Sequence, residues 1–257
     1  MTAPLAGRVA FVTGVGRRRG IGFAIAKRLV AQGADIFTTA HAAYDASQPW
    51  GADPDGAAAL VEELRASGRR VEHAEADLAD PSAPARLFDA ARRHFGHVDI
   101  LVANHAYSGS GALEDLRADD IDRHLHVNVR ATLLLAQAFA AQHDGRAGGR
   151  LVWMVSGQHR SAMPGELAYV ASKGALHQLT RSVAAHLAPR GITVNAVNPG
   201  ATDTGWAPPD LHEAIRAQHP QGRWGEPDDA ARIVAWLASD EARWVTGQII
   251  DSDGGAS

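Results

Sequence analysis

The chain has 257 residues, of which 46% are hydrophobic and 21% charged, the profile of a globular protein with one sizeable core. A formal net charge of −4 supplies no global basic field, so we expect neither nucleic acid nor a membrane surface as a partner. The chain has no cysteine, which excludes disulfides and thiolate catalysis and fits a cytoplasmic protein.

Strand-like runs alternate with helical patterns along the whole chain. Strands are predicted at 8–13, 34–39, 70–74, 98–103, 150–156, 192–197 and 248–251. Helices are predicted at 21–32, 57–66, 81–95, 119–143, 168–187 and 227–238. This alternation indicates an α/β fold: one doubly wound (Rossmann) domain over 1–257, with a parallel sheet of about seven strands and helices on both faces.

Two stretches, 41–56 and 201–223, carry neither pattern and are interpreted as irregular. The second follows a predicted strand, and ligands of open α/β sheets bind beyond the carboxyl ends of the strands. We therefore expect 201–223 to form a lid over the site. The longest apolar helical run, 131–141, is far too short to cross a bilayer.

The thirteen histidines do not follow a metal-binding pattern. The pairs His94/His97 and His124/His126 have no cysteine nearby and no His-Glu-x-x-His spacing. We interpret them as solvated or locally bonded histidines and predict no metal site.

A glycine-rich turn over 13–22 joins the first predicted strand to the first helix. Gly14, Gly16 and Gly20 let the backbone turn tightly and approach a pyrophosphate, and the helix that starts at Ile21 then points its amide donors at the anion. A tight turn alone would also be glycine-rich. The position of the 13–22 turn between a strand and a helix nevertheless favours nucleotide binding.

The end of the second strand decides between the two nicotinamide cofactors. An acidic residue there would bond the ribose hydroxyls and repel a 2′-phosphate, but the strand ends at His41 and the next acid is Asp45. Arg17, Arg18 and Arg19 lie in the glycine-rich turn and can pair with phosphate, although a solvated turn would also be arginine-rich. The pattern favours NADP(H), with NAD(H) possible.

Three residues point to the chemistry. Tyr169 and Lys173 are four apart in a predicted helix, so they share one face. Ser156 ends the preceding strand, where an open α/β sheet carries its site. We expect Ser156 to donate a hydrogen bond to a substrate oxygen, Tyr169 to supply its proton, and the Lys173 cation to lower the pKa of Tyr169 from its ordinary value near 10.

These residues, with others, resemble the short-chain dehydrogenase/reductases, especially those like 3-oxoacyl-carrier-protein reductase. The match covers nearly the whole chain. It includes the glycine turn, Asp77-Leu78, Asn104-His105-Ala106, Asn128, Ser156, Tyr169-x-x-x-Lys173, Asn198-Pro199-Gly200, Thr204, and Thr246-Gly247-Gln248 to Gly255.

The resemblance implies a catalytic tetrad of Asn128, Ser156, Tyr169 and Lys173, in which the asparagine holds a water of a proton relay. From the residues alone, Asn128 is equally well a buried structural amide. The resemblance also implies a homotetramer, or a homodimer. With the glycine turn, the predicted cofactor site comprises Gly14, Gly16, Arg18, Arg19, Gly20, Ile21, His41, Asp77, Leu78, Asn104, Ala106, Tyr169, Lys173, Pro199, Gly200, Thr202 and Thr204.

Two departures from the family pattern stand out. Five residues, instead of three, separate Gly14 from Gly20, which leaves open which arginine meets a 2′-phosphate. The usual Asn-Asn-Ala-Gly is replaced by residues 103–106, where Ala106 adds a methyl group near the cofactor and displaces His105.

The predicted substrate walls combine polar and aromatic side chains from 157–167 and the lid: Gln158, His159, Met163 and Trp206. They are compatible with a carrier-bound acyl chain, a polyketide, a sugar, a steroid or a small alcohol. The predicted activity is NADPH-dependent reduction of a 3-oxoacyl-type or other ketone to an alcohol. The alternatives are a non-catalytic nucleotide-binding regulator or scaffold, and an epimerase or dehydratase of the same fold.

Overall fold

The computed structural model describes residues 3–256, and the predicted fold class is confirmed. Seven parallel strands form one sheet in the order β3-β2-β1-β4-β5-β6-β7. The strands are β1 (Val9–Thr13), β2 (Asp35–Ala40), β3 (Val71–Glu75), β4 (Ile100–Ala103), β5 (Gly149–Met154), β6 (Ile192–Asn198) and β7 (Ile249–Asp251).

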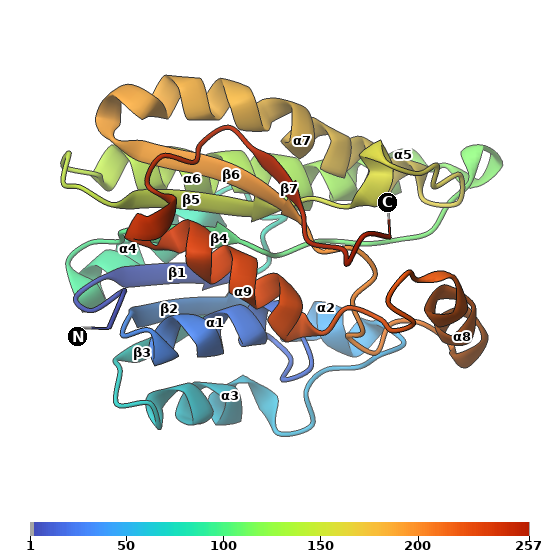
Figure 1. The fold of residues 1–257 in the computed structure, drawn as a ribbon, viewed down its shortest axis with the longest axis horizontal. Coiled ribbons are helices and arrows are strands. Elements are labelled where there is room, and N and C mark those ends of the chain that lie inside the picture. The colour runs from blue at the N-terminus through green and yellow to red at the C-terminus, as the bar shows by residue number, and fades with distance from the viewer. Residues whose placement is uncertain (1–2, 257) are drawn as a thin grey trace.

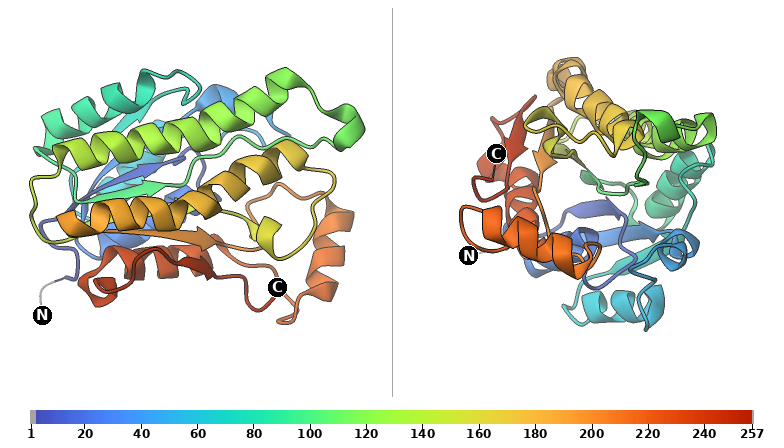
Figure 2. Two further views of the ribbon diagram at one scale, coloured as in Figure 1. Left: turned by 90° about the horizontal axis from the view of Figure 1, so that it is seen from above. Right: turned by 90° about the vertical axis from the view of Figure 1, so that its right-hand side faces the viewer.

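Helices cover both faces of this sheet (Figures 1 and 2). The α-helices are α1 (Ile21–Ala31), α2 (Ala42–Ser47), α3 (Gly56–Arg65), α4 (Ala83–Phe95), α5 (Ala118–His124), α6 (Ala131–Gln142), α7 (Leu167–Leu187), α8 (Pro209–Gln218) and α9 (Pro227–Ala238). In residues 3–256, no helix is long and apolar enough to cross a membrane.

The strands are buried on both faces, which explains their continuous apolar sequences. In β1, Ala10 and Val12 pack in the core beneath α1, α3 and α9, while Val9 and Phe11 pack in the core beneath α4, α6 and α7. The Phe11 ring meets two other phenylalanine rings edge-on, at centroid distances of 5.1 and 5.2 Å. Two cores on opposite faces hold the sheet rigid, so the strand ends are fixed platforms for a site.

The strand order reverses between β1 and β4, whose connections lead to opposite sides of the sheet. A crevice opens at such a point beyond the carboxyl ends of the strands. The helix α1 begins at this crevice after Gly20, with no acidic residue in its first turn and no side chain capping its amides. Its positive end therefore remains available for an anion.

Three predictions are corrected, one of a helix and two of irregular stretches. The helix predicted over 119–143 is instead α5 and α6 joined by a π-helical segment, η2 (Leu125–Arg130). π-Helical turns are rare and leave no periodic signature in a sequence, and they gather at functional sites. The stretches predicted to be irregular, 41–56 and 201–223, contain the short helices α2 and α8. Figure 1 shows α8 at the end of the molecule opposite the N-terminus, and its role as a lid stays a prediction.

Candidate active site

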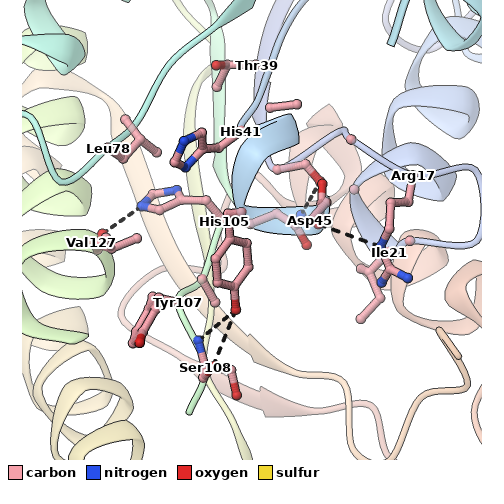
Figure 3. Close-up of a pocket in the computed structure, with 18 of the residues that line it drawn as sticks. Arg17, Ile21, Thr39, His41, Asp45, Leu78, His105, Tyr107, Ser108 and Val127 are labelled. Carbon is pink, nitrogen blue, oxygen red and sulfur yellow. Dashed lines mark hydrogen bonds and ion pairs between the residues drawn. The ribbon is translucent and has the colours of Figure 1, made fainter. Parts of the chain in front are cut away.

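A pocket of about 270 Å³ lies at the carboxyl ends of β1, β2 and β4. Figure 3 shows Leu78, His41 and His105 on one side of it and Arg17 and Ile21 on the other. Many of the predicted cofactor residues line it: Gly14, Gly16, Gly20, Ile21, His41, Asp77, Leu78, Asn104, Ala106 and Thr204. The glycine turn, the adjacent strand ends and the start of α1 thus meet around one cavity.

The backbone of the glycine turn approaches its neighbours too closely for side chains. Gly14 has φ +73°, in the left-handed region that favours glycine. A Cβ on Gly22 would overlap the Gly14 carbonyl oxygen and the Asn104 side chain. Asn104 Nδ2 donates to the carbonyl oxygens of Thr13 and Gly14, at 3.0 and 3.2 Å, and so fixes the turn to the end of β4.

The three turn arginines point in different directions. Arg18 contacts the carboxylates of Asp53, Asp55 and Glu63 at 2.9–3.3 Å on the outer surface. Arg19 makes a bidentate pair with Asp203, at 2.7 and 2.8 Å. Neither Arg18 nor Arg19 lines the pocket, and both are paired with carboxylates, so their predicted role as cofactor residues stays a prediction.

Arg17 is the turn arginine that lines the pocket. Its Nη1 donates to the carbonyl oxygen of Thr204 at 3.0 Å, its Nε lies 3.8 Å from Asp45 Oδ1, and its guanidinium lies 5.3 Å from the centroid of the Trp50 ring. Burial lowers the pKa of Arg17 and raises that of Asp45. The planar guanidinium of Arg17, held in this way, can donate two parallel hydrogen bonds to a phosphate.

No motif in the sequence predicts the residues that α2 and its flanks bring to the pocket. The Tyr44 hydroxyl accepts a hydrogen bond from the Ser108 amide at 3.0 Å, and its ring centroid lies 5.6 Å from that of Tyr107. Tyr44, Asp45 and Trp50 all line the cavity. The only sign of them in the sequence is two aromatic residues, Tyr44 and Trp50, in a stretch of otherwise small and polar residues.

The second half of the site is the Ser156–Tyr169–Lys173 cluster. The side chains of Ser156 and Tyr169 are hydrogen bonded. Lys173 Nζ lies 5.7 Å from the centroid of the Tyr169 ring and donates to the carbonyl oxygen of Met154, the last residue of β5, at 2.9 Å. The predicted serine, tyrosine and lysine are therefore brought together at the carboxyl end of the sheet.

Burial, and not the charge of Lys173, has the largest effect on the pKa of Tyr169. Burial raises the pKa of Tyr169 to about 12, and the hydrogen bond with Ser156 offsets only part of this rise. Burial likewise lowers the pKa of Lys173 to about 8. Removal from water disfavours the charged form of each group. At neutral pH the Tyr169 phenol therefore keeps its proton.

Asn128 lies in the π-helical segment with its amide fully buried. Its Oδ1 accepts from the Tyr107 amide at 2.7 Å, and its Nδ2 donates to the Tyr107 carbonyl and to Ser172 Oγ, both at 2.9 Å. Ser172 Oγ in turn donates to the Tyr169 carbonyl at 2.8 Å. The side chain of Asn128 thus joins the loop after β4 to the helix that carries Tyr169 and Lys173.

The remaining predicted residues lie outside the pocket lining. Thr202 Oγ1 donates to the Pro199 carbonyl at 3.2 Å, which closes the turn that follows β6. Trp206 Nε1 donates to the Thr202 carbonyl at 3.1 Å, and its ring meets that of Trp224 at 5.7 Å. The others are Tyr169, Lys173, Pro199, Gly200, Gln158, His159 and Met163.

Comparison with known proteins places these features in a family. Residues 14–257 match the family model described as enoyl-(acyl carrier protein) reductase. A short-chain dehydrogenase from Burkholderia cenocepacia, solved in complex with NADP, is 41% identical and superimposes with a TM-score of 0.88 over 98% of this chain and 99% of that one. The chain belongs to the short-chain dehydrogenase/reductase family.

Two further relatives of this oxidoreductase family match along nearly their full lengths. The uncharacterized oxidoreductase YjdA of Bacillus subtilis is 41% identical over 250 residues, which cover 96% of each chain. A blue fluorescent protein from a metagenomic library, solved in complex with NADPH, is 40% identical with a TM-score of 0.88 over 99% of each chain.

His105, one of the departures from the usual family pattern, is a buried and fixed imidazole in this member. Its Nε2 donates to the Val127 carbonyl at 3.0 Å (Figure 3), and its Nδ1 lies 2.7 Å from Thr13 Oγ1. Thr13 Oγ1 already accepts the amides of Asn104 and His105, so its own proton goes to Nδ1. The ring is therefore neutral, and burial, with the Lys173 charge, lowers the pKa of His105 to about 4.

We expect His105 to make folding stability depend on pH. In the unfolded chain, His105 has an ordinary pKa near 6.5, whereas in the folded chain it takes up a proton only near pH 4. Folding stability therefore falls as the pH drops from about 6.5 to about 4. His105→Gln keeps a donor for Val127 and an acceptor for Thr13 without titrating. Between pH 7 and 4.5, urea unfolding should show the wild type losing about 2–3 kcal/mol more than this variant. Equal losses would contradict the neutral buried imidazole.

No group of three or more histidine, aspartate or glutamate side chains within 3–256 is arranged to hold a metal ion.

Proposed function

We propose that this family member reduces a ketone to an alcohol with NADPH. The observation that carries the proposal is the hydrogen-bonded pair of Ser156 and Tyr169 hydroxyls beside the buried Lys173, next to a glycine-lined pocket. Two hydroxyl donors that meet at one point suit a substrate oxygen that gains negative charge and then a proton.

Each residue has a separate task in this proposal. Ser156 donates a hydrogen bond to the carbonyl oxygen as its charge develops, and Tyr169 transfers its phenolic proton to that oxygen. Lys173, through its charge, stabilises the phenolate that remains. Asn128 holds the loop after β4 against the helix of Tyr169, and the family's proton relay would pass beside it. NADPH, when bound, supplies the hydride.

The residues present fit a dinucleotide. The glycine turn leaves room where a Cβ on Gly22 would overlap the backbone, and the first turn of α1 offers uncapped amides for the pyrophosphate. Asp77 and Leu78 line the same pocket at the proposed adenine end. Arg17 supports NADP(H) over NAD(H), and two relatives were solved with NADP or NADPH.

Absorbance at 340 nm, followed against a panel of ketones, tests the function. The panel should include 3-oxoacyl thioesters, free and carrier-bound, together with aromatic polyketide-like ketones and small ketones. NADPH consumption with one class supports the reductase. Cofactor binding without turnover across the panel would favour the regulator or scaffold, and product formation without net NADPH consumption would favour the epimerase or dehydratase.

Arg17 gives the sharpest prediction for cofactor choice. Arg17→Ser removes the pocket cation, and we expect the Kd for NADP⁺ to rise about tenfold or more while the Kd for NAD⁺ changes little. Arg18→Ser is the matched control, because its guanidinium is paired on the outer surface. Isothermal titration calorimetry of the wild type and both variants measures the Kd for each cofactor. Equal weakening of both cofactors by Arg17→Ser would contradict a 2′-phosphate contact.

We also propose a cytoplasmic homotetramer, or a homodimer. The support within the described residues is apolar exposure: the Trp244 side chain is 94% exposed and Trp236 is 40% exposed. A tryptophan left in water is unusual, and an interface with further copies of the chain would bury it. Sedimentation velocity measures the assembly.

A further inference from the structure

The turn that carries Ser156 is held by the two side chains that follow it. Ser156 precedes the 3₁₀ turn η3 (Gly157–His159). Its backbone amide donates to Gln158 Oε1 at 3.2 Å, and its carbonyl oxygen lies 3.3 Å from His159 Nδ1. A carbonyl oxygen only accepts, so Nδ1 carries a proton. The orientation of Ser156 therefore depends on the imidazole of His159.

The other nitrogen of His159 faces a carboxylate. His159 Nε2 lies 3.2 Å from Asp251 Oδ1, at the end of β7. A neutral ring with its proton on Nδ1 would turn the Nε2 lone pair toward this negative oxygen, which is repulsive. Two acceptors on opposite edges of one ring are satisfied together only when both nitrogens are protonated. The side chains are only 21% and 27% exposed, which strengthens the ion pair relative to one in open solvent.

Asp251 also connects this turn to the neighbouring strand end. Its Oδ1 accepts from Asn198 Nδ2 at 2.9 Å, and Asn198 Oδ1 accepts from the Gly200 amide at 3.1 Å. The turn after β6 carries Pro199 and Gly200, which are among the predicted cofactor residues. One carboxylate thus ties the Ser156 turn to the turn that would lie against the cofactor.

We propose that the His159–Asp251 ion pair positions Ser156 for catalysis and makes ketone reduction depend on the protonation of His159. The inference rests on the proposed role of Ser156 as a donor to the substrate oxygen. A neutral His159 can donate to only one of its two acceptors. Either the Ser156 carbonyl or the Asp251 carboxylate then loses its hydrogen bond with His159. Activity should therefore fall on the alkaline side as the imidazolium disappears.

Other charged groups bear on the same ring. Arg160 Nε lies 3.8 Å from Asp251 Oδ2 and competes for the carboxylate. On α7, the His177 ring lies 4.7 Å from that of His159, and burial and the charge of His159 lower the pKa of His177.

Asp251→Asn tests the proposal with an isosteric change. It keeps an oxygen for Asn198 and removes the charge that favours the imidazolium. We expect kcat at its pH optimum to fall about tenfold or more, the alkaline limb of the kcat profile to move to lower pH, and KM for NADPH to stay within about twofold. His159→Gln should remove the limb, and the double variant should match the worse single variant because the two residues act as a pair.

Two further measurements separate a positioning role from a merely structural one. His177→Gln is the matched control and should keep the wild-type pH profile. Titration of the histidine ring signals by NMR should show His159 deprotonating at lower pH in Asp251→Asn than in the wild type. An unchanged kcat profile, or an unchanged His159 titration, would overturn the proposal. The NMR result does not require turnover, so it stands apart from failure of the proposed reductase activity.

Discussion

Tyr169→Phe is expected to lower kcat for ketone reduction by about a hundredfold to ten thousandfold. The phenol is buried, hydrogen bonded with Ser156 and protonated at neutral pH, because burial raises its pKa to about 12. Phenylalanine keeps the ring and removes the proton that the substrate oxygen must receive. Steady-state kinetics with the best ketone of the panel measures the loss.

Binding data complete this test. Tyr169→Phe should bind NADP⁺ nearly as well as the wild type, since the residues lining the pocket are unchanged, so thermal stabilisation by the cofactor should persist. Retained turnover in Tyr169→Phe would exclude Tyr169 as the proton donor. Loss of both turnover and cofactor binding would instead indicate a structural role for the hydroxyl.

Lys173→Met is expected to abolish most activity and at the same time stabilise the fold. A buried lysine whose pKa is about 8 is costly to keep charged at pH 7, by up to about 3 kcal/mol relative to its ordinary pKa of 10.5. Methionine removes this cost and loses only the bond to the Met154 carbonyl. We expect a net gain of about 2 kcal/mol at pH 7, measured by urea unfolding, with kcat reduced at least about a hundredfold.

The pH dependence identifies the cause of this gain. The unfolded chain binds more protons than the folded one between pH 8 and 10.5, so wild-type stability rises with pH there and the advantage of Lys173→Met should shrink. Lys27→Met is a suitable control, because Lys27 is the only other lysine in the chain and its side chain is 65% exposed. A Lys173→Met variant less stable than the wild type at pH 7 would show that the ammonium contributes more to the fold than its burial costs.

The sequence predicts the parts of the fold that local rules determine. The helix over 227–238 is confirmed to the residue, because Pro227 starts it and a capping box joins Glu226 and Asp229. The π-helical turn at Asn128 is not predictable in this way, since it is fixed by the Tyr107 backbone and Ser172, which come from distant segments. Tertiary contacts override the continuous helical pattern there.

In the site, too, some features follow from local rules and others from tertiary contacts. The serine, tyrosine and lysine meet because strand ends and helical spacing are regular features of the fold. Which turn arginine reaches the pocket depends instead on the partners of Arg18 and Arg19. The carboxylates that bind Arg18 lie 35 or more positions away in the chain, and Arg19 pairs with Asp203. The pKa of Tyr169 depends on burial, which no spacing reveals.

The transfer of deuterium from NADPH that carries deuterium at both nicotinamide C4 positions tests the central claim most directly. With the ketone that turns over best, the account predicts one deuterium on the carbinol carbon of the alcohol, detected by mass spectrometry and NMR. Deuterium on a carbon of a reduced C=C bond, or an alcohol without deuterium, would contradict carbonyl reduction by this site.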